Sequence, residues 1–122
     1  MGRGGSRRKV LFVEDDPLVR TMYERFFSSV YELTFAGSGS QALQALKGFT
    51  PDVVVLDMRL PDTDGVALFQ AIRSTHPVLP VIVTTAYVSV EPLLKMLDLE
   101  HAGYLVKPFQ MDELAARINA IG

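Results

Sequence analysis

Three short runs of consecutive apolar residues are the clearest pattern along the chain. They lack the alternation of apolar and polar positions that is typical of a half-exposed strand. This indicates strands of a parallel sheet that is covered by helices on both faces. Two weaker runs bring the number of predicted strands to five. The predicted strands are 10–13, 31–36, 53–56, 81–83 and 103–106.

Segments with apolar residues three and four positions apart follow each of these runs and predict helices. The first helix begins at Asp16-Pro17, an N-cap followed by a proline at the first helical position. Its apolar positions, which we expect to pack on the sheet, are Leu18, Met22 and Phe26 on one face and, beside them, Val19, Tyr23, Phe27 and Val30. The other helices are predicted at 40–47, ended by Gly48, and at 65–75, 89–99 and 111–121. The order (βα)5 predicts an α/β fold with a doubly wound, five-stranded parallel sheet.

Length and composition narrow the class of protein. The 122 residues fit one domain, and 48% hydrophobic residues are enough for a core of that size. We expect the domain to span residues 9–122, after a disordered tail at 1–8 that is rich in Gly and Arg. The net charge of -2 argues against direct nucleic-acid binding, and no apolar run approaches the roughly 20 residues that span a membrane. The absence of cysteine excludes disulfides and thiolate metal sites and agrees with a cytoplasmic location.

Charged and polar residues follow the predicted strands at one edge of the sheet, where doubly wound folds bind their ligands. They are Glu14, Asp15 and Asp16 after the first strand, Asp57 after the third, Thr84 and Thr85 after the fourth, and Lys107 after the fifth. If the first and third strands are neighbours, Asp15 and Asp57 share a small volume and repel each other unless a cation lies between them. Mg²⁺ suits such a pair of carboxylates. The alternative is that these acids only cap the following helices, as we expect of Asp16.

The same residues resemble a known family. Glu14-Asp15, then Asp57 with Pro61 and Gly65 behind it, then Thr85-Ala86 and finally Lys107-Pro108-Phe109 stand in the order found in the receiver domain of two-component response regulators. The resemblance covers residues 9–121. It implies a flavodoxin-like, chemotaxis-regulator-like fold with strand order 2-1-3-4-5. It also implies phosphorelay signalling, in which a histidine kinase or a histidine phosphotransfer protein phosphorylates Asp57. Such a domain is a regulatory phosphoacceptor that catalyses only its own phosphorylation and dephosphorylation.

The resemblance also assigns a role to each matched position. Asp57 is the nucleophile. Asp15, Asp57 and the backbone carbonyl of Arg59 are ligands of Mg²⁺ or Mn²⁺. Glu14 contacts the ion through water, although a glutamate here leaves direct contact open. Lys107 and Thr85 would each bind a phosphoryl oxygen.

Further positions are implied to control switching and lifetime. Tyr104 stands where the family often carries a switch aromatic that moves together with Thr85. The Lys107–Pro108 peptide bond would be cis. Arg59 and Tyr87, two residues after the acceptor and after Thr85, are the positions that admit or exclude the hydrolytic water, and both are large.

The fourth predicted helix carries more apolar residues than one buried stripe requires: Val90, Leu93, Leu94, Met96, Leu97 and Leu99. We therefore expect part of this helix to form an output surface with strand 5 and helix 5. Phosphorylation would tighten a mainly apolar contact there, with an effector protein or domain or with a second copy in a homodimer.

Two alternatives remain open at this point. The stretch 37–42 matches the G-x-G-x-x-A pattern of dinucleotide-binding loops, and Asp57 lies 20 residues after Gly37. That interpretation leaves Asp15, Thr85 and Lys107 without a role, so a simple turn with Ser38 or Ser40 as helix cap is the favoured explanation of the stretch. The second alternative is a pseudo-receiver that is not phosphorylated. His76 and His101 are isolated in the sequence, and we expect surface or capping roles for them.

Overall fold

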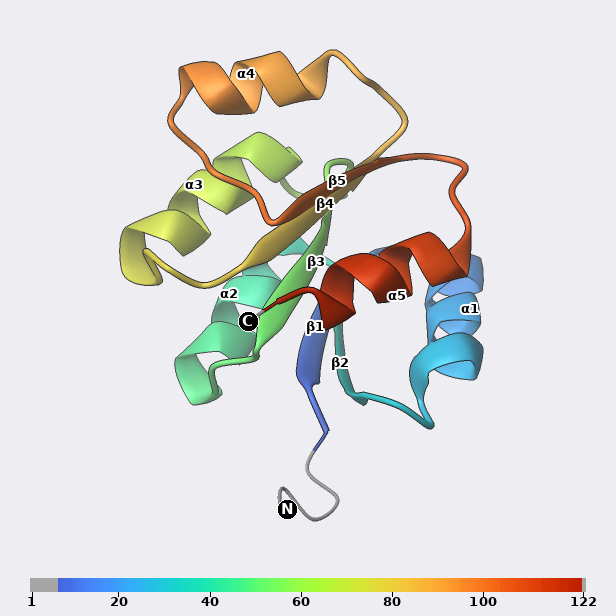
Figure 1. Ribbon diagram of the computed structural model, residues 1–122. Helices are drawn as coiled ribbons and strands as arrows, with labels where there is room; N and C mark the ends of the chain where they lie inside the picture. The colour runs from blue at the N-terminus through green and yellow to red at the C-terminus, as the bar shows by residue number, and fades with distance from the viewer. Residues whose placement is uncertain (1–6, 122) are drawn as a thin grey trace.

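The computed structural model describes residues 7–121 and has the predicted (βα)5 order (Figure 1). Each strand is followed by one helix. The elements are β1 (Lys9–Val13), α1 (Pro17–Phe27), β2 (Glu32–Ala36), α2 (Gly39–Gly48), β3 (Val53–Asp57), α3 (Gly65–Thr75), β4 (Val81–Thr85), α4 (Val90–Met96), β5 (Gly103–Val106) and α5 (Met111–Asn119).

The five strands form one parallel sheet in the order β2-β1-β3-β4-β5, which confirms the flavodoxin-like α/β fold. Helices α1 and α5 cover one face, and α2, α3 and α4 lie on the other (Figure 1). Every residue of β3 and of β4 is buried. Helices on both faces therefore explain why the central strands are apolar without alternation.

The core has two layers, one on each side of the sheet. Successive residues of β1 point to opposite faces, so Leu11 and Val13 pack with α2, α3 and α4, whereas Val10 and Phe12 pack with α1 and α5. The second layer contains a group of aromatic rings. The Phe12 ring stacks on Tyr23 at a centroid distance of 4.5 Å and on Phe35 at 5.5 Å. These rings hold α1 against the sheet directly beneath the end of β1.

One predicted face of α1 is wrong. The row that packs on the sheet contains Tyr23 and Phe27, whereas the row Leu18, Met22 and Phe26 is between 46% and 69% exposed. Val30, also predicted to pack on the sheet, lies beyond the end of the helix and is exposed. The two rows start one residue apart, which is about 100° around a helix of 3.6 residues per turn. Only one of them can face the sheet. An apolar ridge, formed by Leu18, Met22 and Phe26, therefore lies open along α1.

Several predicted boundaries also differ. Gly48 is the last residue of α2, not its terminator, and the cap is Phe49. Helix α4 ends at Met96, not at residue 99, because Asp98 turns the chain with a left-handed φ of 61°. Helix α5 ends at Asn119, two residues early. Strand β2 starts at Glu32, one residue after the buried Tyr31.

Most of the predicted tail lies outside the described residues, which begin at Arg7. Arg7 donates a hydrogen bond to the carbonyl of Ser28 at 2.9 Å, and the Arg8 carbonyl accepts the N–H of Glu32 at 2.8 Å. Among the helices described, none has the length and apolar character needed to cross a membrane.

Candidate functional site

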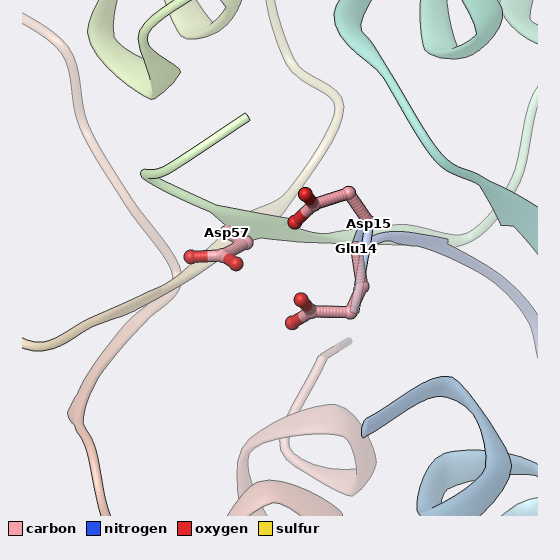
Figure 2. A group of neighbouring side chains, drawn as sticks. All are labelled: Glu14, Asp15 and Asp57. Atoms are coloured by element: carbon pink, nitrogen blue, oxygen red, sulfur yellow. The ribbon is translucent and has the colours of Figure 1, made fainter. Parts of the chain in front are cut away.

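Three carboxylates meet where β1 and β3 end. Glu14 and Asp15 follow β1, and Asp57 is the last residue of β3, its neighbour in the sheet. Each side chain contributes an oxygen to a group whose atoms lie within 4.8 Å of one another. Figure 2 shows the three carboxyl groups gathered around one space at this edge. Asp15 and Asp57 thus lie close together, as predicted. The group offers a metal ion only oxygen ligands, which Mg²⁺ prefers.

The environment of Glu14 is unfavourable for a negative charge. Glu14 is 2% exposed, and burial raises the pKa of its carboxyl from 4.5 to about 7, with a further contribution from the negative Asp57. Its Oε1 atom is buried without a hydrogen-bond partner. Asp57 is also buried, whereas Asp15 is exposed. A cation at this point would relieve the repulsion between the carboxylates. The residues present therefore fit a Mg²⁺ site.

Lys107 brings the positive charge predicted at the end of β5. Its Nζ lies 3.2 Å from Asp57 Oδ2 and 3.7 Å from Glu14 Oε1. Its backbone N–H donates to the Thr85 carbonyl at 2.7 Å, and the Lys107–Pro108 peptide bond is cis, as the resemblance implied. The ammonium group therefore faces both buried acids. It contacts only one oxygen of Asp57, so Asp57 Oδ1 is free to accept another hydrogen bond.

That other oxygen is held by the loop between β3 and α3. The Arg59 N–H donates to Asp57 Oδ1 at 3.2 Å, and the Arg59 side chain is exposed. At the base of the loop, the Gly65 N–H donates to the Met58 carbonyl at 2.9 Å. A Cβ atom on Gly65 would lie 2.4 Å from Met58 Cα, so only glycine allows this closure.

Thr85 and Tyr104 meet at the backbone of Tyr87. Thr85 is buried at the end of β4, and its Oγ1 accepts the Tyr87 N–H at 3.2 Å. The Tyr104 hydroxyl donates to the Tyr87 carbonyl at 2.5 Å. Tyr104 is half-buried, and burial raises the pKa of its hydroxyl. One peptide segment therefore joins the two residues assigned to the switch.

Other residues near the site were not predicted. The hydroxyls of Tyr23 and Thr84 are buried without hydrogen-bond partners, and burial together with Glu14 and Asp57 raises the pKa of Tyr23. Tyr23 belongs to the apolar row of α1, and nothing in that pattern indicates that its hydroxyl lies near the acids.

The G-x-G-x-x-A stretch has an internal partner. Ser38 caps α2 through the Gln41 N–H, as one of the two expected caps. The Asp62 carboxylate accepts the N–H groups of Gly39 and Ser40 at 2.8 and 3.0 Å. A carboxylate of the chain thus occupies the place where a dinucleotide-binding loop would hold a phosphate.

The two histidines lie away from the acid site. His76 caps the end of α3. The Nε2 atom of His101 lies 2.7 Å from Glu91 Oε2 and links the start of β5 to α4.

A doubly wound sheet with three carboxylates and a lysine at its carboxyl edge defines a flavodoxin-like domain with an acidic pocket. Residues 10–119 match the sequence profile of the response regulator receiver domain. The chain belongs to this family, whose members are regulatory phosphoacceptors of two-component signalling rather than conventional enzymes.

Individual relatives agree with this assignment. The chain is 39% identical over 114 residues to the response regulator MprA of Mycolicibacterium vanbaalenii, which covers 93% of this chain and 49% of MprA. The Francisella response regulator 1452 receiver domain superposes with a TM-score of 0.85 at 32% identity, over 94% of this chain and 96% of that one. The receiver domain of sensor histidine kinase PA1611 from Pseudomonas aeruginosa was solved with magnesium in its active-site cleft. It superposes with a TM-score of 0.83 at 28% identity, over 95% of this chain and 98% of that one. The chain spans half or less of the length of the curated relatives it matches.

Proposed function

We propose that this domain accepts a phosphoryl group on Asp57 from a histidine kinase or a histidine phosphotransfer protein and switches its α4/β5/α5 surface in response. The observation that carries the proposal is the setting of Asp57. It is a buried strand-end carboxylate with Lys107 Nζ at 3.2 Å and with Glu14 and Asp15 beside it.

In the proposed reaction, a carboxylate oxygen of Asp57 attacks the phosphorus of a phosphohistidine. The P–N bond breaks, and the donor imidazole leaves with the bonding electron pair. Lys107 stays close to the acyl phosphate and offsets its charge, and the Thr85 hydroxyl donates a hydrogen bond to a phosphoryl oxygen.

The residues present fit a divalent cation. Asp15, Asp57 and the carbonyl of Arg59 would hold Mg²⁺ or Mn²⁺, with Glu14 beside them, directly or through water. The buried, unpartnered Oε1 of Glu14 and the raised pKa of its carboxyl support a positive charge at this place. When bound, the cation supplies positive charge that offsets the negative charge of the transferring group.

The switch runs through Tyr87. At present Thr85 Oγ1 accepts the Tyr87 N–H, and the Tyr104 hydroxyl holds the Tyr87 carbonyl. A Thr85 hydroxyl that turns to a phosphoryl oxygen changes its contact with Tyr87, so the same peptide transmits the change to Tyr104. Phosphorylation would thereby bias two arrangements of α4 and β5.

The proposed output surface has the required apolar character. Tyr87, Val88, Leu93, Met96 and Leu97 are between 40% and 82% exposed, whereas Leu94 is buried. We propose that these side chains contact an effector protein or domain, or a second copy of the chain, after phosphorylation. The proposal includes a cytoplasmic location, which is typical of a receiver domain.

The test is to incubate the protein with Mg²⁺ and a small phosphodonor and to measure the intact mass. We expect one phosphoryl group to be added per chain, and none in the presence of EDTA or in Asp57→Asn. The control Asp52→Asn, at the opposite end of the sheet, should behave like the unsubstituted protein. No phosphorylation of a folded protein would favour the pseudo-receiver alternative. Light scattering and partner pull-down with beryllofluoride, a phosphoryl mimic, then test the output surface. An unchanged mass and unchanged partner binding, together with no spectral shifts in α4 and β5, would refute it.

A further inference from the structure

The loop between β3 and α3 carries the Arg59 carbonyl, the one metal ligand proposed outside a side chain. At its base the loop is closed by the Gly65–Met58 hydrogen bond and by a bridge between Arg59 and Asp64. These contacts join the loop only to itself and to the elements that flank it. They place no hydrogen bond between the far end of the loop and the rest of the fold, although Leu60 packs against the core on this side of the sheet.

Asp62 forms such hydrogen bonds from the tip of the loop. Its Oδ1 accepts the Gly39 N–H at 2.8 Å, and its Oδ2 accepts the Ser40 N–H at 3.0 Å. The two N–H groups lower the pKa of the Asp62 carboxyl, so the bonds are charge-assisted. Within residues 7–121, no other hydrogen bond joins residues 59–63 to an element besides β3 and α3.

Helix α2 does not depend on Asp62 for its own cap. The Ser38 side chain already accepts the Gln41 N–H at 3.1 Å. The packing between the helix and the loop is close: a Cβ atom on Gly39 would lie 2.5 Å from Thr63 Cγ2 and 3.3 Å from Asp62 Oδ1. A glycine at the first turn of α2 therefore admits the tip of the loop.

We propose that Asp62 is a positioning residue for the metal site, and this inference rests on the proposed function. By tying the tip of the loop to α2, Asp62 fixes the peptide of Arg59, whose N–H bonds to Asp57 and whose carbonyl would be a ligand of the cation. Hydrogen bonds that orient a metal ligand typically change metal affinity by about 10- to 100-fold. Asp62 is exposed and is not among the residues that would contact the cation or the phosphoryl group, so it acts through Arg59.

The test compares Mg²⁺ binding by calorimetry and phosphorylation by a small phosphodonor in the full chain. We expect Asp62→Ala to raise the Mg²⁺ Kd about tenfold. The maximal phosphorylation rate at saturating Mg²⁺ stays close to that of the unsubstituted protein, because Asp57 and Lys107 are unchanged. In the metal-free protein, the amide resonance of Arg59 is expected to shift or broaden, which reports the loop without any activity.

Matched variants separate positioning from charge. Asp64→Asn removes one charge from the same loop but keeps the oxygen that caps α3 through the Ala67 N–H, so Mg²⁺ affinity is expected to hold. Asp62→Asn keeps one acceptor oxygen of two and is expected to be intermediate. Gly39→Ala pushes Thr63 away without any change of charge and is expected to weaken Mg²⁺ binding as Asp62→Ala does.

An unchanged Mg²⁺ Kd in folded Asp62→Ala would overturn the inference. Equal weakening in Asp62→Asn and Asp64→Asn would overturn it as well, since the effect would then be one of charge alone. Absence of Mg²⁺ binding and of phosphorylation in the unsubstituted protein would instead overturn the proposed function and, with it, the role of Asp62.

Discussion

Replacing Glu14 by glutamine is expected to stabilise the protein at pH 8 without Mg²⁺. The carboxyl of Glu14 is buried, its Oε1 has no hydrogen-bond partner, and Asp57 repels it. Its pKa is about 7 in the folded state against an ordinary 4.5. Between these two values the folded state binds more protons than the unfolded state, so stability falls as the pH rises from 4.5 through 7.

The size of the effect follows from the pKa. A difference of about 2.5 units at 1.36 kcal/mol each gives roughly 3 kcal/mol of lost stability above pH 7, as an upper value. Glutamine has a similar shape and no charge, so Glu14→Gln should recover most of that amount. Near pH 4.5 the two proteins should differ little, because the glutamate is then protonated in the folded state.

The assay is urea unfolding at pH 4.5, 6 and 8, in EDTA and in Mg²⁺. Glu24→Gln, an exposed glutamate on α1, is the control and should match the unsubstituted protein. Mg²⁺ should narrow the gap between the Glu14→Gln variant and the unsubstituted protein at pH 8, because the ion neutralises the acids. Equal unfolding free energies of Glu14→Gln and the unsubstituted protein in EDTA at pH 8 would refute the reasoning. A difference between them that does not change with pH would refute it as well.

Three further predictions address the metal, the phosphoryl group and the loop. Asp15→Ala should raise the Mg²⁺ Kd measured by calorimetry, and an unchanged Kd would exclude Asp15 as a ligand. Alanine at both Arg59 and Tyr87 should shorten the lifetime of the phosphorylated protein, since both large, exposed side chains can cover the acceptor; an identical time course would argue against shielding. Gly65→Ala should cost about 2 kcal/mol or more in urea unfolding because its Cβ would lie 2.4 Å from Met58 Cα. Gly48→Ala, with open space around it, should not destabilise the protein.

The sheet and the centre of the site were predictable because both follow from strand ends. An apolar run without alternation fixes a strand of a parallel sheet, and the next polar residue then lies at the carboxyl edge. This logic places Asp57 and Lys107 together although 50 residues separate them, and the distance of 3.2 Å agrees. The assignment of roles to these residues still rested on the resemblance and stays a proposal.

What sequence reasoning missed depends on contacts across the fold. The apolar residues Leu97 and Leu99 predicted a longer α4, but Asp98 turns the chain so that the Leu99 N–H reaches the Leu94 carbonyl at 2.8 Å and Leu99 becomes buried. The pairing of Asp62 with α2 joins two loops whose approach no local pattern records. The same is true of the exposed apolar ridge on α1, because either row had the spacing of a buried face.

The position of Lys107 has a consequence for the synthesis of the protein. A ribosome makes β1 first, yet β1 lies between β2 and β3 in the sheet. Strand β1 can therefore be paired on both sides only after β2 and β3 have been made. The acids at the edge of the sheet are complete once Asp57 has emerged, and their compensating ammonium group arrives only with β5. If the strands of a chain that stops between these residues paired, the acids would repel each other without the ammonium group of Lys107 to offset their charge. We therefore expect folding to become favourable only after the last fifth of the chain has been made. Shortened chains should fold less well and should be degraded more readily by proteases.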